Sequence, residues 1–208
     1  MGAQPPDSCD SWPGPPGWFG KIPALGDFAS RRLPSDFIEA WDAWLSVEIA
    51  AARQALGPDW PASYLNSPTW RFALMPGVLD STYWYGILTP SVDRVGRQFP
   101  LTFAASCKAP ADRLSRWWAA LVAVAARAGE PGCDAGALDD ALVAATRGRD
   151  DAGPVSVESG REPAATLAVA SIGDSLWWPR RVGSGDFGTP STFHGLPAGE
   201  QFLRLICP

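Results

Sequence analysis

The spacing of large apolar residues along the chain predicts three helices. After Pro34, apolar and often aromatic side chains recur every three or four residues until Gly57 and Pro58, which supply a stop signal. The same spacing recurs over about residues 111–128 and, more weakly, in ALDDALVAATR, which ends at Gly148. The pattern therefore predicts one long helix early in the chain and two in its second half.

Short runs of aromatic and branched residues, separated by Pro and Gly, predict strands. Three of them follow one another and are expected to be antiparallel neighbours: WRFALM (70–75), YWYGILT (83–89) and FPLTFAAS (99–106). Three more lie nearer the C-terminus: TLAVAS (166–171), SLWW (175–178) and FLRLI (202–206). The part of the chain from residue 166 onward is too short to bury a core of its own, so its strands should return to the same sheet.

The strands FPLTFAAS and TLAVAS lack the polar alternation of a strand with one wet face, so helices should cover both faces of the sheet. We therefore predict an α/β fold, a three-layer α/β/α sandwich with a central mixed, largely antiparallel sheet. Residues 1–17 hold five Pro and three Gly with little to bury, and are expected to form a disordered tail. Residues 18–208 are expected to form a single domain.

Composition and charge exclude several classes of function. A net charge of −5 opposes binding to nucleic acid, which needs clustered Lys and Arg. The most apolar stretch, WWAALVAVAA, is too short to cross a bilayer, and the first residues do not form a secretory signal. Four widely spaced cysteines without a CxxC pair suit a reducing cytosol. We expect a cytoplasmic protein without membrane insertion.

Motifs for cofactors and catalysis are weak. GSGDFG (183–188) matches a dinucleotide-binding pattern in its letters but lacks the strand before it and the helix after it, so it indicates a glycine-rich loop. A single histidine and the absence of metal-ligand spacings argue against a metal or other cofactor. The enzyme alternative is a small hydrolase in which Ser91 or Cys107 is activated by His194, and it requires these groups within about 3.2 Å of one another.

The segment GILTPSVDRVGRQFPLTF (86–103) carries charged residues on a turn between two buried strands. Asp93, Arg94 and Arg97 lie there, and Gly96 permits a sharp turn. One interpretation is an Asp–Arg ion pair that fixes the loop. The other is an exposed Arg pair that receives a carboxylate or a phosphorylated side chain of a partner protein.

Two adjacent tryptophans in SLWW are the next candidates. Trp177 and Trp178 must point to opposite faces of a strand. Both are buried if helices cover both faces, whereas an exposed one would suit a contact with another protein.

Five segments resemble the TagF (ImpM) family of proteins associated with the type VI secretion system. They are FGKIPALGDFASR with LPSDFIEAWDAWL, YLNSPTWRFALMPGV, GILTPSVDRVGRQFPLT, SLWW and GLPAGEQF. Their order runs from about Trp18 to Phe202, nearly the whole chain.

The resemblance implies a non-enzymatic cytoplasmic regulator, mostly a repressor of secretion-system assembly, that binds a forkhead-associated scaffold protein. For the binding surface we expect Asp93, Arg94 and Arg97. Three further charged residues are the second choice, namely Lys21, Asp27 and Arg71. All of them could instead tie loops to the sheet.

Overall fold

A seven-stranded antiparallel sheet forms the middle of the computed structural model, with strands in the order β2-β1-β5-β4-β3-β6-β7. The structure describes residues 15–106, 111–130, 132–146, 163–180 and 188–207. The strands are β1 (Gly17–Gly20), β2 (Ala29–Arg31), β3 (Trp70–Leu74), β4 (Trp84–Thr89), β5 (Leu101–Ser106), β6 (Asp174–Pro179) and β7 (Ser191–His194). The presence of both helices and strands confirms the α/β class. Every described pairing is antiparallel, so the predicted mixed sheet is not found within this part of the chain.

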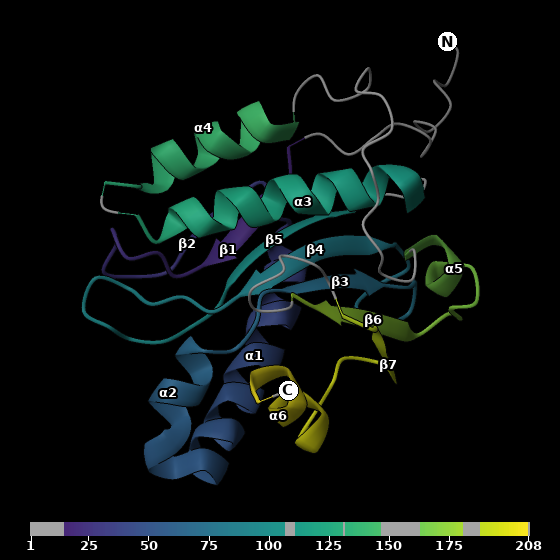
Figure 1. Ribbon diagram of the computed structural model, residues 1–208, viewed down its shortest axis with the longest axis horizontal. Helices are drawn as coiled ribbons and strands as arrows, with labels where there is room; N and C mark the ends of the chain where they lie inside the picture. The colour runs from purple at the N-terminus through teal and green to yellow at the C-terminus, as the bar shows by residue number, and fades with distance from the viewer. Residues whose placement is uncertain (1–14, 107–110, 131, 147–162, 181–187, 208) are drawn as a thin grey trace.

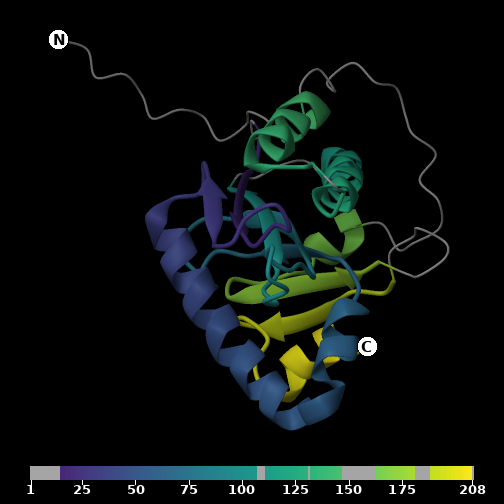
Figure 2. The same ribbon diagram turned by 90° about the vertical axis from the view of Figure 1, so that its left-hand side faces the viewer.

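Helices lie on two sides of this sheet (Figures 1 and 2). The helices α3 and α4 lie on one side, and α1, α2 and α6 lie on the other. Their bounds are α1 (Ser35–Leu56), a short 3-10 helix η1 (Gly57–Asp59), α2 (Trp60–Leu65), α3 (Ala111–Ala128), α4 (Ala135–Thr146), α5 (Pro163–Leu167) and α6 (Glu200–Ile206). All three helices predicted from the apolar spacing are present.

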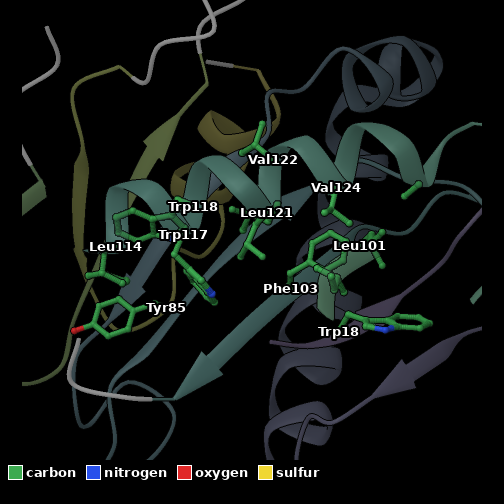
Figure 3. Close-up of a cluster of buried hydrophobic side chains, with 14 of the residues drawn as sticks. Trp18, Tyr85, Leu101, Phe103, Leu114, Trp117, Trp118, Leu121, Val122 and Val124 are labelled. Atoms are coloured by element: carbon green, nitrogen blue, oxygen red, sulfur yellow. The ribbon is translucent and has the colours of Figure 1, made fainter. Parts of the chain in front are cut away.

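Each side of the sheet has its own core. Beneath α3, Trp117 and Trp118 pack against the sheet (Figure 3), and the Trp118 indole donates to the backbone oxygen of Gly86 at 2.9 Å. On the α1 side, the buried indole of Trp41 donates to the Thr102 hydroxyl at 2.8 Å. The indole N–H groups of Trp118 and Trp41 thus have partners, which offsets the cost of removing these polar groups from water.

Two of the predicted strands are wrong: one segment is helical and the other is part helix and part turn. Residues 166–171 fall in the end of α5 and the turns after it, where Val169 is 79% exposed. Pro163 at the start and the alanines that follow favour a helical turn. Residues 202–206 belong to α6, in which Phe202, Leu205 and Ile206 are buried. Their spacing of three and four residues is that of a helix face.

The structure also contains elements that the apolar pattern does not predict. They are the short strands β1, β2 and β7 and the helical segments η1, α2 and α5. Gly17, which we placed at the end of the tail, is the first residue of β1 and pairs with Ala104. The three central strands 70–75, 83–89 and 99–106 are confirmed as antiparallel neighbours, and SLWW does return to the sheet as β6 beside β3. Among the described residues, no helix is both long and apolar enough to span a bilayer.

Candidate functional site

Residues 90–98, most of the connection between β4 and β5, form a closed turn that we call the 90–98 loop. Val92 and Gln98 form an isolated antiparallel bridge at its base. The Asp93 amide donates to the Arg97 carbonyl oxygen at 3.1 Å, and the Gly96 amide donates to the Asp93 carbonyl oxygen at 2.9 Å. Gly96 has φ +81°, a conformation that side chains disfavour. The loop therefore has a single, hydrogen-bonded backbone path.

Asp93 is the buried centre of this loop, with 2% of its surface exposed. Its carboxylate accepts the amides of Val95 and Arg97 at 3.0 and 2.8 Å, and the Arg97 Nε–H at 2.6 Å. Lys21 adds an ion pair, with Nζ 3.1 Å from the carboxylate. Burial alone would raise the pKa of Asp93, but these hydrogen bonds hold it well below its ordinary value.

A second segment, residues 21–27, lies directly against the 90–98 loop. The Arg94 amide donates to the Leu25 carbonyl oxygen at 2.8 Å, and the Arg97 Nη2 group donates to that of Gly26. The Ser91 hydroxyl donates to the Lys21 carbonyl oxygen at 2.7 Å. Hydrogen bonds at both ends of the loop thus join it to the connection between β1 and β2.

The helix α2 supports the loop from another direction. The Tyr64 hydroxyl donates to the Ser91 carbonyl oxygen at 2.9 Å and accepts the Ser91 amide at 3.0 Å. Burial raises the pKa of Tyr64, so this phenol stays protonated at any physiological pH. The Trp60 indole donates to the Gln98 side-chain oxygen at 2.6 Å. The loop is therefore held by segment 21–27 on one side and by two buried aromatic residues of α2 on another.

Three side chains on the outer face of the loop are exposed. They are Arg94, Val95, which is 68% exposed, and Arg97. Arg97 combines both interpretations of the sequence, because its Nε group is paired with Asp93 while 57% of its side chain is exposed. Arg94 has no ion pair within the described part of the chain. The fixed backbone thus presents two guanidinium groups at the surface.

The remaining charged candidates do not gather into one cluster. Lys21 is buried beside Asp93, and Asp27 is exposed and accepts the amide of Phe28 at 2.8 Å. Arg71 lies in β3, away from the loop, with its guanidinium 5.7 Å from the ring centre of Trp118. Burial lowers the pKa of Arg71 to about 9. Its surroundings are those of a residue inside the fold.

Both tryptophans of SLWW are buried. Trp177 belongs to the core on the α1 side and Trp178 to the core beneath α3, with 0% and 2% of their surfaces exposed. They point to opposite faces of β6, as the strand geometry predicts. In this structure neither offers surface to a partner, so the interpretation in which one of them is exposed is not supported.

The structure keeps apart Ser91 and His194, one of the two pairs of the hydrolase alternative. The Ser91 hydroxyl donates to the Lys21 carbonyl oxygen. His194 lies on the edge strand β7, with its Nδ1 atom 3.5 Å from Asp174. The strands β3 and β6 separate β4 from β7, which is about 14 Å at the usual strand spacing. The pairings of β7 with β6, β6 with β3 and β3 with β4 place His194 level with the start of β4. Ser91 comes after the other end of β4, so the length of that strand adds to the separation. Cys107 and residues 183–187 of GSGDFG lie outside the described residues.

Four residues of this site were not singled out from the sequence: Arg53, Trp60, Tyr64 and Gln98. Arg53 sits in the last turn of α1, with its guanidinium 5.4 Å from the ring centre of Trp60, and donates to the Gln98 carbonyl oxygen at 3.3 Å. The only local signal was the helix stop at Gly57, which places Arg53 near a helix end. Its proximity to the loop depends on how α1 packs on the sheet.

Comparison with known proteins decides the family. Residues 17–145, more than half of the chain, match the family model described as the TagF N-terminal domain, type VI secretion system-associated. The chain belongs to the TagF family. All of the 90–98 loop and its supports on α1 and α2 fall within the matched residues.

A solved structure extends the similarity of this TagF-family chain beyond the matched region. The crystal structure of PA0076 from Pseudomonas aeruginosa PAO1 superposes with a TM-score of 0.73 at 33% sequence identity, and the alignment covers 92% of this chain and 93% of that one. No curated protein is similar enough to count as a match. Family membership supports an accessory role in the type VI secretion system.

Proposed function

We propose that this TagF-family protein is a non-enzymatic, cytoplasmic regulator that restrains assembly of the type VI secretion system by binding its forkhead-associated scaffold protein. The observation that carries the proposal is the pair Arg94 and Arg97, exposed on a loop whose backbone is fixed by the buried carboxylate of Asp93. A surface that is rigid before binding loses little conformational entropy on association. Two guanidinium groups on such a surface suit recognition of carboxylates or phosphates.

The fold supports the same proposal. Residues 18–208 would act as one domain, a three-layer α/β/α body in which each side of the sheet has its own core. Both tryptophans of SLWW and the Lys21–Asp93 pair are buried and stabilise this body. The exposed face of the 90–98 loop offers charged side chains for contact with another protein.

The direct test is complex formation with the scaffold. The purified protein and the forkhead-associated scaffold should form a complex with a Kd in the micromolar range or below, and the complex should weaken as salt is raised, because exposed charges contribute to it. The absence of a complex at micromolar concentrations would contradict the proposal.

The regulatory direction needs a measurement in cells. If the protein restrains assembly, cells that lack it should contain more assembled secretion machines, and overproduction should reduce their number. An unchanged or reduced number in the deletion strain would contradict the repressing role but leave the binding proposal to its own test.

A further inference from the structure

A groove opens beside the 90–98 loop, between the end of α1, the η1–α2 segment and the loop itself. Its volume is roughly 590 Å³, within the range of about 300 to 1,000 Å³ that is usual for ligand sites. The residues that matter for its chemistry are Lys21, Arg53, Trp60, Pro61, Arg97 and Gln98. This volume is several times what one small ion needs, so the groove has room for a peptide segment of another protein.

The charge of this groove is opposite to that of the whole protein. Lys21, Arg53 and Arg97 line it, and among the described residues the carboxylate that pairs with them is Asp93, which contacts Lys21 and Arg97. Two positive charges therefore remain in a chain whose net charge is −5. An anionic group is attracted to such a local excess of positive charge.

Both guanidinium groups are already in place. Arg97 is held by Asp93 and by the carbonyl oxygen of Gly26. Arg53 lies over the ring of Trp60 and donates to the Gln98 carbonyl oxygen. Within the described residues, these bonds leave the Nη1 groups of both arginines available as donors. A ligand would not have to fix these two long side chains, and this lowers the entropic cost of binding.

The rest of the groove is apolar or proline-rich. Pro58, Pro61 and the edge of Trp60 lie beside the charged groups. An acidic side chain with apolar neighbours in an extended peptide would satisfy both the cations and the apolar walls.

We infer that this groove binds a carboxylate side chain, Asp or Glu, carried by an extended acidic segment of the partner protein, with Arg53 and Arg97 as the recognising groups. The inference rests on the proposed function, because the groove shares Arg97 with the exposed face of the 90–98 loop. It adds the chemistry of the recognised segment and assigns a role to Arg53.

Short random peptides displayed on phage provide a probe that does not depend on the scaffold. Peptides selected on the whole protein should contain Asp or Glu next to apolar residues, and replacing that acid by its amide should abolish binding. For a selected peptide, Arg53→Gln should weaken the Kd at least about tenfold. Arg53→Lys, which keeps the charge but not the planar fork, should weaken it less.

A matched control removes the same charge elsewhere. Arg127→Gln lies in the last turn of α3 on the other side of the sheet and should leave the Kd unchanged. Equal melting temperatures of the variants and the parent protein exclude a folding defect as the cause.

The inference is overturned by selected peptides without an acid, by no selected peptide at all, or by an Arg53→Gln variant that binds as tightly as the parent. Inorganic phosphate at millimolar concentration is a second probe. If phosphate shifts the NMR signals of the groove while acidic peptides do not, the groove is a small-anion site and the inference is wrong. Scaffold binding that persists in Arg53→Gln would sink this inference but leave the proposed function standing.

Discussion

The ammonium group of Lys21 lies 3.1 Å from the carboxylate of Asp93, and both side chains are almost completely buried. This pair joins two connections that are 72 positions apart in the sequence, which makes it a tertiary contact between the β1–β2 and β4–β5 connections. A buried charge pair is costly to form and more costly to break, because removal of one partner leaves the other charged and unpaired. Lys21 and Asp93 therefore stabilise the 90–98 loop against the β1–β2 connection.

The first prediction concerns this support. Asp93→Ala should lower the melting temperature by about 5 °C or more, because Lys21, Arg97 and two backbone amides lose their acceptor together. Thermal unfolding followed by circular dichroism measures the shift. Asp27→Ala, which removes an exposed carboxylate nearby, is the control and should change the melting temperature by less than about 2 °C. Equal effects of the two substitutions would contradict the supporting role of Asp93.

Acid should expose the same dependence. The folded-state pKa of Asp93 lies below its ordinary value of about 3.9, so its stabilisation is fully present above about pH 4 and is lost as the pH falls further. The parent protein should therefore lose stability more steeply than Asp93→Asn between about pH 4 and pH 2. Other carboxyl groups titrate in both proteins, so the difference between the two curves is the quantity to measure. Parallel curves would mean that the pKa of Asp93 is not lowered by folding.

The two exposed arginines should separate binding from stability. The Arg94 amide donates to the Leu25 carbonyl oxygen through the backbone, so Arg94→Glu keeps this hydrogen bond. The variant should leave the melting temperature within about 1 °C while it weakens scaffold binding at least about tenfold. Arg97→Glu should reduce both, because its Nε group is bonded to the buried Asp93. Calorimetric titration and thermal unfolding of both variants check this. Unchanged binding by Arg94→Glu would remove Arg94 from the interface.

Much of the fold follows from patterns in the sequence, and the exceptions have physical reasons. The helices α1 and α3 and the strands β3, β4 and β5 are strongly patterned, and α4 more weakly, so their local signals agree with their packing. The strand β2 has three residues and β7 has four, mostly exposed, so neither has enough buried positions to show a period. The segment FLRLI was misassigned because a short apolar run fits a buried strand and a buried helix equally well.

For the candidate site, the sequence predicted the loop but not its neighbours. Asp93, Arg94 and Arg97 lie within five residues, so a turn suffices to bring them together. Arg53 and Trp60 reach the same place only because α1 packs across the sheet and ends at Gly57. No local pattern records such a contact between distant segments. The burial of Lys21 was likewise invisible, since its acceptor lies in another connection.

A separate contact ties α4 to the edge of the sheet. The guanidinium of Arg32 forms two contacts with the Asp139 carboxylate, at 2.8 and 2.6 Å, and the Trp18 indole adds a donor at 3.2 Å. This forked pairing lowers the pKa of Asp139. Because the pair is partly exposed, Asp139→Ala should cost only about 1 kcal/mol of unfolding free energy. The exposed neighbour Asp140→Ala is the control and should cost less than about 0.5 kcal/mol in the same denaturant titration.

Close packing around Gly86 in the middle of the sheet should make a substitution there costly. A Cβ atom at Gly86 would lie 2.2 Å from the Phe103 carbonyl oxygen and 2.4 Å from the ring of Phe72, and both neighbours are fixed inside the fold. Gly86→Ala should therefore cost at least about 3 kcal/mol, since neither backbone nor buried ring has room to yield. Gly129→Ala meets no atom within 4 Å and should change stability by less than about 0.5 kcal/mol. Chemical denaturation compares the two, and a mild effect at Gly86 would mean that β4 and β5 are able to separate locally and that the sheet is less tightly packed than this structure has it.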